Sequence, residues 1–102
     1  KPSQLQSDVV REIQSRGARV KEEHRCEVSG YSIDALVTLN DGARVAVEVD
    51  GPSHFIGRSH QLTGATLLKH RQLRYFGWRL EIVSYWEWNR SKELHWLPQS
   101  SQ

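Results

Sequence analysis

This 102-residue chain is poor in the features that mark several protein classes. Its one cysteine, Cys26, excludes an internal disulfide and a four-cysteine zinc site, and a lone thiol fits a reducing compartment. No apolar run reaches the roughly 20 residues that a membrane helix needs, so no membrane partner is expected. We expect one compact domain over residues 1–97, with a frayed tail at 98–102. The start on Lys1 predicts a piece of a longer protein.

Acidic residues are missing from a long central stretch. From Gly51 to Leu80 the sequence has no Asp or Glu, and it carries five cations: Arg58, Lys69, Arg71, Arg74 and Arg79. Arginine is favoured for phosphate contacts because its fork binds two oxygens at once. On charge alone, a solvated helix face is the more common explanation. Both explanations stay open at this point.

Apolar periodicity and turn residues predict the element order α-β-β-β-α-β-α. The first helix follows Ser3 and stops at Gly17, and the second covers residues 62–76 and is ended by Gly77. The predicted strands are residues 19–28 (an edge strand), 31–39, 43–49 and 78–83, and a short last helix starts near Ser91. A helix between two strands implies a right-handed crossover and parallel pairing. The predicted fold class is therefore α/β, with a small mixed sheet flanked by helices.

The segment "NDG", residues 40–42, decides the register between the second and third strands. A three-residue loop with Gly42 in the left-handed region is a common hairpin closure. It places the alternating apolar residues of both strands on one face: Ile33, Ala35, Val37, Leu39, Val45, Val47 and Val49. A two-residue turn would scatter this set over both faces, which is costly when one face is buried. We therefore predict that Asp34 pairs with Glu48 across the hairpin.

Three carboxylates converge in this register, just before a Gly-Pro corner. Asp34 and Glu48 would have Cβ atoms roughly 5 Å apart, with Asp50 as a diagonal neighbour. Facing like charges destabilise a strand pair unless something compensates for them. A divalent cation such as Mg²⁺ is one compensation, because it binds one or two carboxylates together with waters. The alternatives are a protonated acid, an ion pair with Arg44, and screening by solvent.

The second helix brings a cation toward these acids. Its apolar face is predicted from Leu62, Ala65, Leu68, Leu73 and Phe76, with Lys69 near the middle and Gln72 also on it. A lysine in that position either snorkels to the edge of the face or reaches a negative group. The two explanations are comparable here. The other sides of the helix are predicted to carry His70, Arg71 and Arg74.

Three segments, taken in this order, resemble a known family. "SIDALV", "VAVEVDGPSHF" and "LTGATLLKHRQLRYFGWRLEIVSYWEW" are similar to the RAP domain, a module abundant in apicomplexan RNA-associated proteins. The resemblance is strongest over residues 31–88. RAP domains in turn resemble PD-(D/E)xK endonucleases of the very-short-patch-repair type. The resemblance therefore implies a restriction-endonuclease-like fold.

In those nucleases an Asp on one strand and a D/E-x-K pair on the next bind Mg²⁺ and activate water. The resemblance matches Asp34 and Glu48 to the two acids, whereas Asp50 stands where the lysine is expected. Lys69 or Gln72 could replace that lysine from the neighbouring helix, and His54 could act as general acid or base. One hypothesis is thus a Mg²⁺- or Mn²⁺-dependent endoribonuclease, with Asp34, Glu48 and Asp50 as metal ligands.

The preferred hypothesis is an RNA-binding module of an organellar RNA-processing protein. The family resemblance implies a mitochondrial or chloroplast setting, RNA-binding helical repeats upstream, and a role in RNA processing, stability or translation. The candidate contacts to single-stranded RNA are Arg58, Arg71 and Arg74 for phosphates, and Trp86 and Trp88 for stacking on bases. The alternative for these tryptophans is packing of the last helix onto the sheet, and packing is favoured for Trp78. A weaker third hypothesis is a protein-interaction domain.

Overall fold

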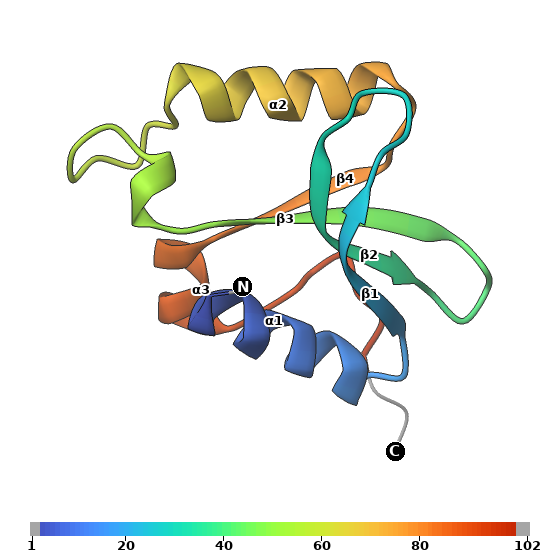
Figure 1. Cartoon of the computed structure of the whole chain (residues 1–102). Coiled ribbons are helices and arrows are strands. Elements are labelled where there is room, and N and C mark those ends of the chain that lie inside the picture. The colour runs from blue at the N-terminus through green and yellow to red at the C-terminus, as the bar shows by residue number, and fades with distance from the viewer. Residues whose placement is uncertain (1–2, 100–102) are drawn as a thin grey trace.

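The chain is built in three layers, with one sheet between two layers of helices (Figure 1). The computed structural model describes residues 3–99. Within them, no helix is long and apolar enough to cross a membrane. The elements are α1 (Gln4–Ser15), β1 (Arg19–Arg25), β2 (Ser32–Thr38), β3 (Arg44–Asp50), the 3-10 turn η1 (Pro52–His54), α2 (Gly64–Tyr75), β4 (Leu80–Ser84) and α3 (Tyr85–Ser91).

The sheet has the order β1-β2-β3-β4 and is mixed. β1 and β3 are antiparallel to β2, and β4 is parallel to β3 after the crossover through α2. Figure 1 shows α2 on one face of the sheet, and α1 with α3 on the other. The predicted element order, the edge position of β1 and the mixed pairing are confirmed.

Several predicted boundaries are wrong, including the start of α2, which begins at Gly64 rather than at residue 62. α3 begins at Tyr85, directly after β4, and ends at Ser91, where Lys92 takes a left-handed conformation with φ 56°. β1 ends at Arg25 because the chain turns there, and Gly30 N donates to Cys26 O at 2.8 Å. β4 begins at Leu80, later than predicted. The predicted tail falls partly on residues 100–102, which lie outside the described residues.

Two apolar cores lie on opposite faces of the sheet. The larger packs α1, α3 and the C-terminal segment on the sheet through Val9, Ile13, Val45, Val47, Val49, Trp88, Leu94 and other residues. The smaller lies under α2 and consists of Cys26, Ile33, Ala46 and Leu73, with Tyr31, Trp78 and Leu80 at its rim. β3 is buried on both faces, so any polar side chain on it must find a partner inside the protein. Trp78 does pack on the sheet, but at the rim of the core under α2 rather than beneath the last helix as predicted.

The hairpin between β2 and β3 has the predicted three-residue loop. Leu39 N donates to Ala43 O at 2.8 Å, and Thr38 pairs with Arg44. Gly42 has φ +88°, the left-handed conformation that this loop requires. The register from Thr38 to Ala35 is therefore the predicted one.

Candidate functional site

The regular pairing of β2 with β3 ends where the acids begin. After Ala35 pairs with Val47, side chains replace the backbone ladder: Asp34 N donates to Glu48 Oε2 at 3.0 Å. Val49 N donates to Asp34 Oδ2 at 2.8 Å. The predicted pairing of Asp34 with Glu48 is not formed, because the regular register ends at Ala35 and Val47. Instead, each carboxylate accepts a hydrogen bond from the backbone of the other strand, and the two side chains bridge the opening between the strands.

The side chains of β2 stop alternating regularly between the two faces of the sheet at this opening. Ala35 packs in the larger core with α1, whereas Ile33 packs in the smaller core under α2. The prediction that these two residues share a face is wrong. On the neighbouring strand Glu23 has φ 54°, so β1 is also distorted beside Asp34. A strand that bends at one residue loses its strict two-residue period there.

Glu48 is paired with the lysine from α2. Its side chain is 1% exposed, and its Oε1 lies 2.7 Å from Lys69 Nζ. Lys69 also donates to Ser32 O at 2.8 Å, which fixes the ammonium between α2 and β2. Lys69 therefore reaches a negative group rather than snorkelling to solvent. The alternative of an ion pair between an acid and Arg44 is not formed within residues 3–99, where the Arg44 guanidinium lies over the Trp78 ring, 5.4 Å from its centroid.

Asp50 lies between two imidazoles. Its Oδ1 is 3.1 Å from His54 Nδ1, and its Oδ2 is 3.1 Å from His70 Nε2. Neither contact has hydrogen-bond geometry, so both carboxylate oxygens of this fully buried residue lack a hydrogen-bond partner within residues 3–99. His54 Nδ1 also lies 3.3 Å from Thr66 Oγ1. The pairs become ionic only when the imidazoles are protonated.

His70 is the site residue that sequence reasoning missed. The inner face of α2 carries Thr66, His70 and Leu73, whereas the predicted apolar residue Leu68 is 45% exposed. The face was predicted from aliphatic residues, but the sheet beneath α2 presents Glu48 and Asp50. The polar side chains of α2 therefore face the sheet, where they lie next to the two acids. The signal in the sequence was the adjacent pair Lys69 and His70 on a helix that follows two strand carboxylates.

Protonation compensates for the remaining like charge. Burial raises the pKa of Asp34 to about 7, with a further contribution from the Glu48 carboxylate. The hydrogen bond from Val49 N and the charge of Lys69 act in the opposite direction. Asp34 is therefore protonated below neutral pH and about half protonated at pH 7, and Lys69 Nζ lies 2.7 Å from Glu48 Oε1.

The described residues do not fit a divalent metal as they stand. Within residues 3–99, no three His, Cys, Asp or Glu side chains are grouped so that they could hold a metal ion. Lys69 and a backbone N–H occupy the two oxygens of Glu48, and Val49 N occupies one oxygen of Asp34. The two oxygens of Asp50 face imidazoles.

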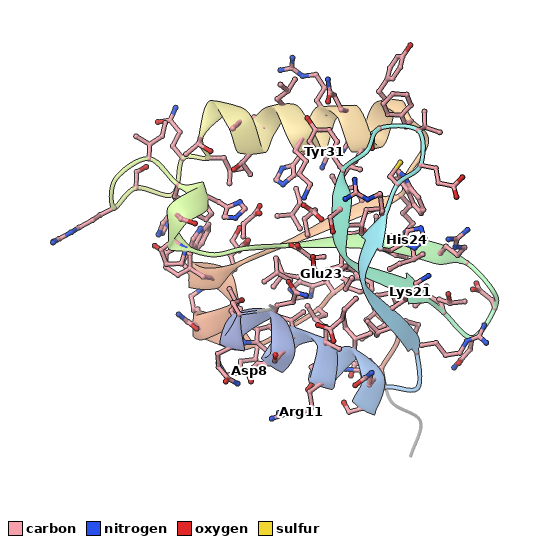
Figure 2. All side chains as sticks on the ribbon, in the orientation of Figure 1. Asp8, Arg11, Lys21, Glu23, His24 and Tyr31 are labelled. Carbon is pink, nitrogen blue, oxygen red and sulfur yellow. The ribbon has the colours of Figure 1, made fainter. Side chains whose placement is uncertain are left out.

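Two cavities flank the acids, and His54 borders both. One of about 210 Å³ lies between β3 and α2 and is lined by Tyr31, Glu48, Asp50, His54, Thr66 and Lys69. Tyr31 is labelled between α2 and β2 in Figure 2. The other, of about 380 Å³, lies between the start of α1 and η1 and contains Asp34. Asp34 thus opens to a different cavity from Glu48 and Asp50.

The candidate RNA-binding residues are distributed over three segments. Arg58 lies in the loop before α2, Arg71 and Arg74 lie on α2, and all three are exposed. Trp86 on α3 is half-buried. Trp88 is 5% exposed and belongs to the larger core, so the prediction that it stacks on bases is wrong.

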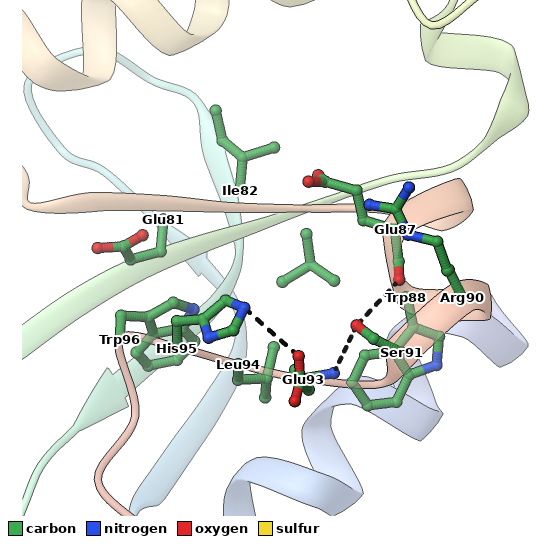
Figure 3. Close-up of a pocket in the computed structure, with 11 residues that line it drawn as sticks. Glu81, Ile82, Glu87, Trp88, Arg90, Ser91, Glu93, Leu94, His95 and Trp96 are labelled. Atoms are coloured by element: carbon green, nitrogen blue, oxygen red, sulfur yellow. Dashed lines mark hydrogen bonds and ion pairs between the residues drawn. The ribbon is translucent and has the colours of Figure 1, made fainter.

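The largest cavity, about 560 Å³, lies apart from these residues, between β4, α3 and the C-terminal segment (Figure 3). Glu81, Glu87 and Glu93 line it together with Arg90 and His95. His95 Nε2 lies 3.6 Å from Glu93 Oε2. Three carboxylates around one opening repel phosphate groups, so this cavity is a poor site for RNA.

Comparison with known proteins identifies the family. Residues 47–96 match the RAP domain model. This chain contains a RAP domain. A RAP domain-containing protein, chloroplastic, from Oryza sativa subsp. japonica is 34% identical over 86 residues, which cover 84% of this chain. The aligned region spans only 13% of that relative's length. The RAP match includes Glu48, Asp50 and α2, and it begins after Asp34.

Proposed function

We propose that this RAP domain binds single-stranded RNA in an organelle, as part of a protein that acts in RNA processing, stability or translation. The observation that carries the proposal is the segment from Gly51 to Leu80. It has no acidic residue, and its Arg58, Arg71 and Arg74 are all exposed. Guanidinium groups on a segment without carboxylates favour phosphate binding, whatever the base sequence.

The α2 side of the sheet is the better surface for RNA. Its exposed helix face combines Arg71 and Arg74 with Leu67, Leu68 and Tyr75, and Tyr75 is 82% exposed. Aromatic rings beside arginines suit the unpaired bases of a single strand, because every base has a face that can stack. The side chains of Asp8 and Arg11 lie on the α1 side, at the other end of the molecule (Figure 2).

The chloroplast is the compartment that the relative's name favours, and the mitochondrion is the alternative implied by the family resemblance. The relative is much longer than this chain, which agrees with RNA-binding helical repeats upstream of the RAP domain. We propose that such repeats select the transcript and that the RAP domain adds contacts to phosphates and bases next to the segment that the repeats bind.

The proposal is tested by the salt dependence of RNA binding. We expect a labelled single-stranded RNA of about ten nucleotides to bind, as read by fluorescence anisotropy, with affinity falling as salt rises. The double variant Arg71→Gln/Arg74→Gln should bind more weakly to all sequences. Its slope of log K against log salt should flatten by roughly 0.7 for each lost phosphate contact.

The matched control is Arg11→Gln/Arg19→Gln, which removes the same charge from exposed residues of α1 and β1. This control should leave the slope near the wild-type value. Equal losses in both double variants would show that net charge, rather than the α2 surface, drives binding. An unchanged affinity in Arg71→Gln/Arg74→Gln would place the RNA elsewhere.

A metal-dependent endoribonuclease is the second candidate, and one observation favours it. Lys69 from α2 lies beside Glu48, where it could replace the missing strand lysine, although a metal bound to Glu48 Oε1 would have to displace it. The test is cleavage of labelled single-stranded RNA with and without Mg²⁺ or Mn²⁺, with Asp34→Asn and Glu48→Gln beside the wild type. Cleavage that both variants abolish supports this candidate. Equal cleavage by all three proteins points to a contaminating nuclease and removes it.

A further inference from the structure

The loop between η1 and α2 is folded onto α3. Phe55 and Leu62 form an isolated bridge, and Ile56 N donates to Gln61 O at 2.8 Å, so the loop is closed at its base. The Phe55 ring packs edge-to-face on Tyr85 of α3, with centroids 5.5 Å apart. These contacts hold the exposed residues 56–61 beside the helix.

An aromatic stack lies where this loop meets α3. The imidazole of His60 is parallel to the Trp86 ring, with an interplanar angle of 0° and centroids 3.9 Å apart. The guanidinium carbon of Arg90 lies 5.4 Å from the centroid of the same indole. His60 is exposed, and Arg58 precedes it by two residues in the loop. The stack is therefore an ordered aromatic surface with Arg90 on its indole and Arg58 two residues before its imidazole in the sequence.

We propose that the exposed face of His60 is a stacking site for an unpaired RNA base, with Arg58 and Arg90 contacting the flanking phosphates. This site rests on the proposed function and specifies where one base binds. An imidazole in a free loop would lose conformational entropy when a base stacks on it. The Trp86 ring already holds His60 in place, which lowers that cost.

The surroundings favour a base over other flat ligands. The loop belongs to the segment from Gly51 to Leu80, which contributes no carboxylate of its own to repel phosphates. The acid nearest in the sequence to Trp86 is Glu87, which lines the cavity between β4 and the C-terminal segment (Figure 3). Stacking on an imidazole tolerates any base, so this site contributes affinity for unpaired strands rather than sequence preference.

The experiment compares two single-stranded RNAs of equal length and charge. One carries all its bases, and in the other the bases are replaced by abasic ribose. His60→Ala should weaken binding to the first RNA about fivefold or more. It should leave binding to the abasic RNA unchanged. His60→Phe keeps a planar ring and should restore binding to the first RNA, whereas Arg58→Gln should weaken binding to both.

His95→Ala is the matched control, because His95 is also an exposed histidine and lies beside Glu93 rather than an aromatic ring. It should bind both RNAs like the wild type. Two outcomes overturn only the stacking site. One is unchanged binding in His60→Ala. The other is tighter binding, which would mean that the base stacks directly on the Trp86 ring once His60 is removed. A wild type that binds neither RNA overturns the proposed function as well.

Discussion

At the scale of single residues, two facing carboxylates are accommodated by different means. Glu48 forms an ion pair with Lys69, whose Nζ lies 2.7 Å from Glu48 Oε1. Burial and the neighbouring Glu48 raise the pKa of Asp34 to about 7, so Asp34 holds a proton over most of the acidic range. From the sequence, removal of either acid should relieve repulsion and preserve stability. In the structure the two carboxylates have different partners, so substituting Asp34 and substituting Glu48 should change stability differently.

Asp34→Asn should flatten the dependence of stability on pH. The folded-state pKa of Asp34, about 7, lies above the value of 3.8 expected for the unfolded chain, so folding takes up a proton between these values. The stabilising contribution is complete below pH 3.8 and is lost as pH rises through 7. It amounts to about 4 kcal/mol at most, and partial exposure lowers it. Melting curves from pH 5 to 8 should show that the stability of Asp34→Asn, relative to that of the wild type, increases as pH rises.

Glu48→Gln is the contrasting variant. It leaves the Lys69 ammonium without its carboxylate, so the protein should lose about 2 kcal/mol across this pH range. The double variant Glu48→Gln/Lys69→Met should recover part of this loss, because the unpaired cation is removed with its partner. For Asp34→Asn, the melting temperature of the variant minus that of the wild type should change with pH. If this difference is constant from pH 5 to 8, Asp34 is already ionised at pH 5.

At the scale of elements, local chemistry predicted some features and tertiary contacts decided others. The hairpin register followed from Gly42 and from the alternation of Val45, Val47 and Val49. The orientation of α2 could not be predicted from its apolar residues, because contacts with Glu48 and Asp50 on the strand beneath determine which side of the helix faces the sheet. α3 was predicted too late in the chain. Its aromatic residues favour strands when considered alone, and packing of Trp88 in the core makes the segment helical.

Gly42→Val should destabilise the hairpin by about 1–3 kcal/mol. Gly42 has φ +88°, which a β-branched residue adopts only with strain, although a Cβ there would meet no atom within 4 Å. Gly51→Val is the matched control, because Gly51 has φ −78° and a Cβ there also meets no atom within 4 Å. Chemical denaturation should show a loss for Gly42→Val alone. Equal losses in both variants would mean that side-chain size, rather than backbone conformation, is responsible.

At the scale of the whole molecule, the two surfaces proposed to bind RNA are joined by the chain that runs from the loop of residues 56–61 into α2. Arg71 and Arg74 are toward the C-terminal half of α2, and the loop precedes its N-terminus (Figure 1). Ten residues of helix separate Gly64 from Arg74, a length of roughly 15 Å, which a single strand of several nucleotides can span. The stack on Trp86 belongs to α3, on the other face of the sheet, and its Arg90 also lines the acidic cavity beside β4.

The triple variant Arg71→Gln/Arg74→Gln/His60→Ala tests whether one strand uses both surfaces. On an RNA of about ten nucleotides, its loss of affinity should equal the product of the losses of its two parts, since distant contacts contribute additively to the free energy of binding. On a trinucleotide, which has only two internucleotide phosphates, the triple variant should lose more than this product, because either surface alone can bind so short a strand and only the triple variant lacks both. Anisotropy titrations of both RNAs at one salt concentration provide the comparison. A triple variant whose loss on the longer RNA also exceeds the product would mean that the surfaces are alternative sites and do not share a strand.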